Sequence, residues 1–169
     1  MRTLWVLRHA KAEPHRAEDH GRKLAARGRL QCAELSEHLA GLAKGRPKLV
    51  LSSSAARALE TAEGVVEALG RKARIAVEPK LYQADADDVL DIVREVDDER
   101  AAVMVVGHNP TMLDLLERVV AASDTSGHGQ LAHGLPTAAL GVVAFDVERW
   151  AELSFGAGRL QSLYVPKAR

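Results

Sequence analysis

The most constraining feature of the chain is a run of four large apolar residues that stops at an arginine and a histidine. Residues 4–7 are Leu-Trp-Val-Leu, and Arg8 and His9 follow at once. A run this short and this uniformly apolar predicts a strand buried on both faces, as in a parallel sheet. In open α/β sheets, ligands bind at the carboxyl ends of the strands. Arg8 and His9 are therefore candidate ligand-binding residues.

The composition fits one globular domain over residues 1–169. Hydrophobic residues make up 47% of the chain, and long and short apolar segments alternate, as in α/β proteins. The 23 basic and 23 acidic side chains balance, so we expect neither a nucleic acid nor a membrane surface as a partner. Because the first strand begins at residue 3 and no apolar run could span a bilayer, we expect a cytoplasmic protein.

Apolar periodicity divides the rest of the chain into alternating helices and strands. It predicts helices over about 24–42, 52–70, 85–96 and 109–120. Short apolar runs predict further strands over 49–51, 74–77, 103–106, 137–145 and 160–165, the last two partly antiparallel. This order predicts an α/β protein, a three-layer α/β/α sandwich around a mostly parallel central sheet.

Two segments and one cysteine fall outside this pattern of sheet and helix signals. Residues 11–23 are charged and aperiodic, and residues 123–134 are rich in Gly, Ser and His. Both are expected to be loops, and the second is expected to be mobile. Cys32 shares a helical face with leucines, which predicts a buried core residue.

Two of the expected helices begin next to candidate site residues. The hydroxyls of residues 52–54, all serines, can cap the second helix, which places Arg57 in its first turn. Asn109 is a suitable N-cap residue and Pro110 a suitable first residue for the fourth helix. His108 then lies between a strand end and a helix start.

Right-handed crossovers bring the ends of these strands to one edge of the sheet. Two arginines and two histidines are expected to meet there: Arg8, His9, Arg57 and His108. Beside helix N-termini, which offer backbone N–H groups, such a set forms a pocket for a tetrahedral oxyanion. Phosphate is the obvious candidate.

Metal and nucleotide chemistry fit the sequence less well. Two arginines would repel a metal cation, and the chain has no HExxH motif, no cysteine pair and no GxxxxGK[ST] loop. We therefore expect no metal and no cofactor. Without a metal to activate water, the pocket needs a covalent nucleophile, and the neutral imidazole of His9 can attack phosphorus. The arginines and a protonated His108 would neutralise the phosphoryl oxygens during transfer.

Three segments resemble the motifs of the histidine phosphatase superfamily, the phosphoglycerate mutase-like proteins. Residues 7–10, Leu-Arg-His-Ala, resemble its RH[AG] signature. Residues 52–62 resemble its arginine-bearing motif, and residues 106–110, Val-Gly-His-Asn-Pro, resemble its second-histidine motif. Any one motif is weak, but all three in order at predicted strand ends are specific.

Other segments are similar to the compact SixA-type phosphohistidine phosphatase branch. They are the RHAK sequence that begins at Arg8, Leu81-Tyr82 and residues 135–140. The resemblance implies a phosphoglycerate mutase-like fold and no need for a metal. It also implies that His9 accepts the phosphoryl group and that the group is bound by Arg8, Arg57 and His108.

The position at which related chains frequently carry a catalytic glutamate is Gln83 here. Gln cannot donate a proton to the leaving group, which favours phosphohistidine as substrate, because imidazole leaves more readily than an alkoxide. Asp19, Asp85 and Asp87 are other acids that could reach the pocket from flanking loops. Gln83 is expected to bind substrate, as is Arg22, which lies in a segment similar to the D-H-D-R-P-L of the branch.

The leading hypothesis is a metal-independent phosphatase that acts through a phosphohistidine intermediate on His9. Its partner would be a phosphohistidine-bearing protein or a small phosphorylated metabolite. The alternatives are a small-molecule phosphomonoesterase of the same superfamily and a non-catalytic module that binds phosphorylated ligands. Of the remaining histidines, His20 and His133 could line the rim of the pocket.

Overall fold

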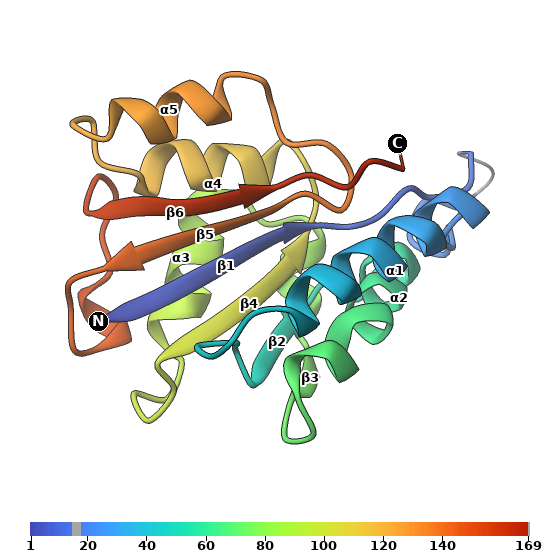
Figure 1. The fold of residues 1–169 in the computed structure, drawn as a ribbon, viewed down its shortest axis with the longest axis horizontal. Helices are drawn as coiled ribbons and strands as arrows, with labels where there is room; N and C mark the ends of the chain where they lie inside the picture. The colour runs from blue at the N-terminus through green and yellow to red at the C-terminus, as the bar shows by residue number, and fades with distance from the viewer. Residues whose placement is uncertain (15–17, 169) are drawn as a thin grey trace.

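The computed structural model of the chain describes residues 1–14 and 18–168, so residues 15–17 of the predicted 11–23 loop lie outside the described residues. Six strands form one sheet in the order β3-β2-β4-β1-β5-β6 (Figure 1). Their bounds are β1 Arg2–Arg8, β2 Leu49–Ser52, β3 Arg74–Val77, β4 Ala102–Gly107, β5 Leu140–Phe145 and β6 Gly158–Tyr164.

The sheet is mostly parallel, as the alternation of strands and helices predicts. Strand β1 pairs in parallel with β4, and β2 pairs in parallel with both β4 and β3. Strand β5 runs antiparallel to β1 and to β6. The prediction of a partly antiparallel end of the sheet is therefore confirmed.

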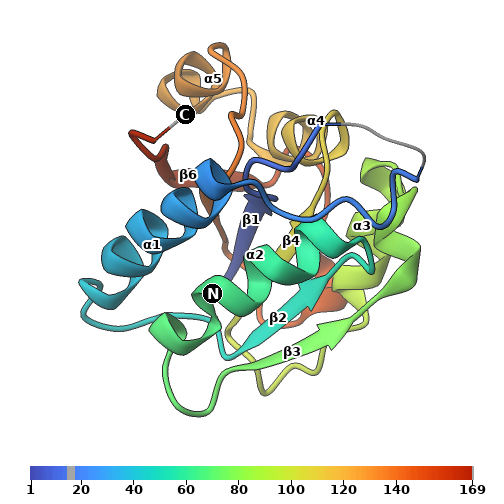
Figure 2. The same cartoon turned by 90° about the vertical axis from the view of Figure 1, so that its right-hand side faces the viewer.

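Helices cover both faces of the sheet and complete the predicted three-layer sandwich (Figures 1 and 2). Helices α1 and α2 pack on one face, and α3, α4 and α5 pack on the other. Their bounds are α1 Ala26–Ala40, α2 Ala56–Val66, α3 Ala86–Arg94, α4 Thr111–Val119 and α5 Thr125–Leu131; single 3₁₀ turns cover Glu67–Leu69, Pro79–Tyr82 and Trp150–Glu152. No helix among the described residues is both long and apolar enough to cross a bilayer.

The side chains of β1 alternate between the two cores. Leu4 and Val6 pack with α3 and α4, whereas Trp5 and Leu7 pack with α1 and α2. All four are buried, and full burial of such a side chain contributes about 1.5–3 kcal/mol. The apolar run that ends at Arg8 is thus the central strand, held from both sides.

The prediction of a loop over 123–134 is wrong, because α5 lies within it. The Asp124 side chain caps this helix by accepting from the Gly127 N–H at 2.9 Å. Its other oxygen accepts from the backbone N–H of Leu160 at the start of β6. Leu131 is buried in the core beside α4. Tertiary contacts therefore order a segment whose composition favours a loop.

The predicted serine cap of α2 is also wrong. Ala55 occupies the N-cap position, and no side chain caps the helix. In α4 the helix begins at Thr111, after Pro110. The Asn109 side chain still accepts a hydrogen bond, at 3.2 Å, from the N–H of Leu113. The hydroxyls of Ser53 and Ser54 face histidines instead.

Candidate active site

Parallel pairing of β1 with β4 places two histidines side by side at the carboxyl edge of the sheet. Arg8 is in register with Gly107, and the His9 N–H donates to the Gly107 carbonyl at 3.0 Å. His9 and His108 follow these two residues directly, and their ring centroids are 5.2 Å apart. The sheet therefore fixes the spacing of the two imidazoles.

His9 is held as a neutral imidazole in one tautomer. Its Nδ1 lies 2.7 Å from the carbonyl oxygen of Ala10, and because a carbonyl can only accept, Nδ1 must carry the proton. Burial, reinforced by the positive charges of Arg57 and Arg8, lowers the pKa of His9 to about 3. The ring is therefore neutral at neutral pH, and Nε2 retains its lone pair.

Arg57, in the first turn of α2, is buried and directs both terminal nitrogens at Asp19. Nη1 donates to the Asp19 backbone carbonyl at 2.9 Å, and Nη2 donates to its carboxylate at 3.0 Å. Thr61, one turn further along α2, accepts from the Ala10 N–H and donates to the Arg57 carbonyl. This threonine links the segment that follows His9 to the helix that carries Arg57.

Among the described residues, Asp19 accepts hydrogen bonds from the side chains of Tyr82, Arg22 and Arg57. The Tyr82 hydroxyl donates to its Oδ2 at 2.6 Å, and Arg22 donates to its Oδ1 from Nη2 at 2.9 Å and from Nε at 3.1 Å. The bond from Tyr82, followed by those from Arg22 and Arg57, holds the pKa of Asp19 far below its usual range. The carboxylate is therefore ionised at neutral pH and has no proton to donate.

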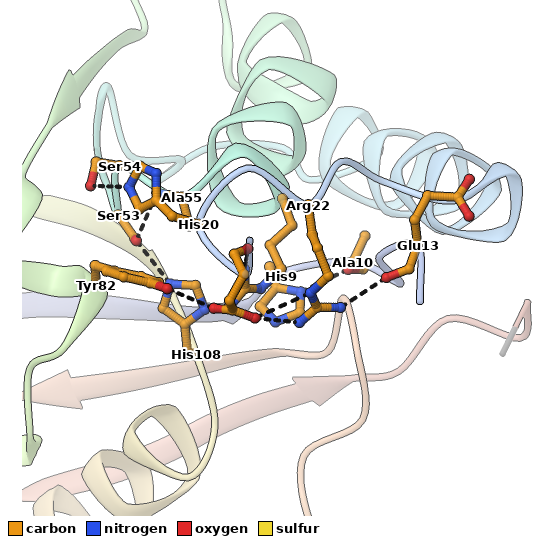
Figure 3. Close-up of polar contacts among 12 residues, drawn as sticks. His9, Ala10, Glu13, His20, Arg22, Ser53, Ser54, Ala55, Tyr82 and His108 are labelled. Atoms are coloured by element: carbon orange, nitrogen blue, oxygen red, sulfur yellow. Dashed lines mark hydrogen bonds and ion pairs between the residues drawn. The ribbon is translucent and has the colours of Figure 1, made fainter. Parts of the chain in front are cut away.

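His108 has a different environment on each ring nitrogen. Its Nε2 lies 2.8 Å from the hydroxyl oxygen of Ser53, whereas Nδ1 is buried and has no hydrogen-bond partner among the described residues. Burial, reinforced by the charge of Arg57, lowers the pKa of His108 to about 4. Figure 3 shows the ring between those of Tyr82 and His9.

Three buried side-chain nitrogens of the candidate site residues have no partner within the described part of the chain. They are Arg8 Nε, Arg57 Nε and His108 Nδ1. Arg8 is held by a 3.0 Å bond from its Nη1 to the Leu135 carbonyl. Buried polar groups are normally paired, so these unpaired nitrogens are open to the acceptors of a ligand. A small oxyanion, with an acceptor on every side, suits these donors.

The structure brings together most of the residues singled out from the sequence. His9 and His108 adjoin each other, and Asp19 joins Arg57 and Arg22 into one network. His20 also reaches this edge, where its Nε2 lies 3.0 Å from Ser54 Oγ and its ring meets that of Tyr82 edge-on.

The remaining candidates take no part in the hydrogen bonds described above for this network. Gln83 is exposed and lines a surface pocket of about 510 Å³ beside α3, which shares Tyr82 with the network around Asp19. Asp85 caps α3, and Asp87 pairs with Arg118, so neither carboxylate joins the network around Asp19. His133 is exposed after α5.

Sequence reasoning missed Ser53, Thr61 and the part played by Tyr82. The serines directly follow a strand that ends at the same edge as β1 and β4, which is a usable signal for Ser53. Nothing local distinguishes Thr61 or Tyr82, because their partners are 51 and 63 residues away. The described residues contain no group of three or more His, Cys, Asp or Glu suited to a metal ion.

Known relatives cover almost the whole chain. An uncharacterized protein of Mycobacterium tuberculosis is 31% identical over 95% of this chain and all of its own length. A protein of Agrobacterium tumefaciens, provisionally assigned as the phosphohistidine phosphatase SixA, is 29% identical, with a TM-score of 0.81 over 98% of both chains. A protein of Nakamurella multipartitia with the same provisional assignment is 27% identical, with a TM-score of 0.81 over 98% of this chain and 96% of its own.

A family model agrees with the geometry. The model of the histidine phosphatase superfamily (branch 1) matches residues 4–102. This span includes Arg8, His9, Asp19 and Arg57, and His108 lies just beyond it, directly after β4, the strand that pairs in parallel with β1. The chain therefore belongs to the histidine phosphatase superfamily and is a hydrolase of the histidine phosphatase type.

Proposed function

We propose that the protein hydrolyses phosphohistidine on a partner protein through a covalent intermediate on His9, without a metal or cofactor. The observation that carries this proposal is the 2.7 Å hydrogen bond from His9 Nδ1 to the Ala10 carbonyl. It leaves Nε2 with a lone pair on a ring that is neutral at neutral pH, which is the state a nucleophile needs.

In the first step, His9 Nε2 forms a bond to phosphorus while the P–N bond of the substrate breaks. The leaving imidazole takes up a proton from solvent, and water then attacks the phosphorus on His9 to release phosphate and the free ring. Negative charge is spread over the phosphoryl oxygens throughout. The unpaired donors of Arg8, Arg57 and His108 are suited to those oxygens, and fixed donors of this kind are the main source of rate in phosphoryl transfer.

The state of Asp19 favours a nitrogen leaving group. An alkyl phosphate must leave as an alkoxide and needs a proton donor, whereas imidazole is a far better leaving group. Asp19 is held ionised, and Asp85 and Asp87 have other partners. The provisional assignment of the two related structures as phosphohistidine phosphatases points to the same substrate class.

A substrate panel tests this proposal. It compares a phosphohistidine-bearing protein with small alkyl phosphomonoesters, using the wild type and His9→Ala. We expect kcat/KM at least about 100-fold higher for phosphohistidine and no turnover by the variant. Equal or better activity on an alkyl ester would instead identify a metabolite phosphatase. Phosphate binding without hydrolysis of any substrate would identify a non-catalytic module.

A further inference from the structure

Ser53 is a fully buried serine whose hydroxyl lies against the second histidine of the site. Its Oγ is 2.8 Å from His108 Nε2 and accepts a hydrogen bond from the Ala55 N–H at 3.2 Å. The hydroxyl proton is therefore free to be donated to the imidazole. On the far side of the ring, Nδ1 is buried without a partner among the described residues.

These contacts allow two arrangements of protons around a neutral His108. In the first, Ser53 donates to Nε2 and the ring proton is on Nδ1, so one buried group, the Nδ1–H, is unpaired. In the second, Nε2–H donates to Ser53, which then accepts twice. The serine proton and the Nδ1 lone pair are both left unpaired. Since each unpaired buried group carries a desolvation cost, the first arrangement is favoured.

A phosphoryl group bound beside Nδ1 would favour the same arrangement of protons. A lone pair on Nδ1 would repel the oxygens of a phosphoryl group, whereas an Nδ1–H would donate to one of them. Burial and the neighbouring Arg57 also keep His108 neutral in the free protein, so its contribution depends on where the single ring proton sits.

We propose that Ser53 is a positioning residue that fixes His108 as its Nδ1–H tautomer and so supplies a neutral hydrogen-bond donor for the phosphoryl group. The tautomer follows from the contacts of the free protein, and the identity of the acceptor rests on the proposed function. Ser53 itself does not contact the reacting atoms. Ser53 acts through its hydrogen bond to the imidazole ring of His108.

Nitrogen-15 NMR of the imidazole rings measures the tautomer directly, in the folded protein and without substrate. We expect the wild type to hold His108 as the Nδ1–H form at pH 7. In Ser53→Ala the Nε2–H form should rise to a large fraction, because the hydroxyl donor is gone. Ser53→Thr keeps a hydroxyl and should restore the Nδ1–H form.

Ser54→Ala is a matched control, because Ser54 makes the same kind of contact with a different histidine. Its Oγ lies 3.0 Å from His20 Nε2. This variant should change the spectrum of His20 and leave the tautomer of His108 as in the wild type. It also controls for general effects of removing a hydroxyl from this turn.

Vanadate, a phosphate mimic, gives the second measurement. Loss of one oriented hydrogen bond should weaken vanadate binding by Ser53→Ala about tenfold, and Ser54→Ala should stay within about twofold of the wild type. A wild-type His108 found as the Nε2–H form, or unchanged by Ser53→Ala, would overturn the proposal. If the tautomer shifts as expected but no variant binds vanadate, the tautomer assignment stands and the proposed function fails.

Discussion

Both terminal nitrogens of Arg57 are bonded to Asp19, one to its backbone carbonyl and one to its carboxylate. Only Nε of this buried guanidinium is left without a partner among the described residues. Asp19 therefore fixes the orientation of Arg57 and leaves its Nε–H, together with the second hydrogen of each terminal nitrogen, for other acceptors. The same carboxylate also accepts from Tyr82 and Arg22, so within the described part of the chain Asp19 joins its own loop to α2 and to the turn that carries Tyr82.

Replacing Asp19 with Asn should destabilise the free protein by about 1–3 kcal/mol at pH 7, because Arg57 loses a charged partner. The Asp19 side chain is 35% exposed, so the cost stays below that of breaking a fully buried pair. Its folded-state pKa is lowered, so its stabilisation is complete above the ordinary aspartate pKa and is lost as pH falls below it. Urea unfolding should show the free energies of unfolding of the wild type and Asp19→Asn becoming equal at acidic pH.

Asp91→Asn is the control for this experiment, because Asp91 forms an exposed pair with Arg94 at the same 3.0 Å. Pairs of this kind contribute between zero and about 1 kcal/mol. An equal loss of unfolding free energy in Asp91→Asn and Asp19→Asn would contradict the role given to Asp19.

Protonation of the two site histidines in the unfolded chain should make stability pH-dependent from about pH 6.5 down to about pH 4 for His108 and about pH 3 for His9. Their folded-state pKa values are lowered to about 3 and about 4, while the unfolded chain has the ordinary value near 6.5. Below pH 6.5 the unfolded state therefore binds protons that the folded state does not. The free energy of unfolding should decrease as the pH is lowered. Each histidine adds up to about 1.4 kcal/mol per pH unit to this slope.

Measuring unfolding free energies of His108→Gln across this range should show a shallower slope than the wild type. A matched replacement of the exposed His133 controls for histidine loss elsewhere. Parallel curves for the wild type and His108→Gln would show that His108 titrates normally.

Gly28→Ala should displace the segment that follows His9. A Cβ at this position of α1 would lie 2.1 Å from the Lys11 carbonyl oxygen, so the backbone must shift. We expect a loss of stability of about 1–3 kcal/mol, as for overpacking, and lower kcat. Gly129→Ala in α5 has open space around its Cβ and should be stabilising by about 0.5–1 kcal/mol. Equal changes in melting temperature for Gly28→Ala and Gly129→Ala would contradict this prediction.

Thr61→Val should lower both stability and kcat, because it removes the acceptor of the buried Ala10 N–H while keeping the shape of the side chain. An unpaired buried N–H costs about 1–3 kcal/mol. The Ala10 peptide also orients His9, so turnover should fall as well. Thr111→Val is the comparison, since its hydroxyl bonds the Ala84 carbonyl and not the Ala10 peptide. Full activity in Thr61→Val would contradict a functional role for the bond between Thr61 and the Ala10 N–H.

Sequence reasoning placed the strand ends well because each apolar run stops at a polar residue. Parallel pairing then requires Arg8 to lie opposite Gly107, which brings His9 to His108. Contacts between distant loops carry no such local signal. The bond between Tyr82 and Asp19 spans 63 residues, and the bond that ties the α5 cap to Leu160 spans 36.

Ser53 was assigned by a local rule that tertiary structure overrides. A serine before a helix usually caps it, yet α2 has no side-chain cap, and this hydroxyl faces His108 instead. The role of such a residue depends on which side chain the sheet places opposite it. That information lies in the pairing of β2 with β4 rather than in either segment alone.

The most direct test of the central claim is the chemical identity of the trapped phosphoenzyme. Wild-type protein mixed rapidly with labelled phosphohistidine substrate and quenched in alkali should carry phosphate on His9, and phosphorus NMR should identify the Nε2-phosphorylated isomer, because Nδ1 is engaged by Ala10. His9→Ala should carry none. Phosphate on Nδ1, on another residue, or full turnover with no phosphoenzyme would contradict the account.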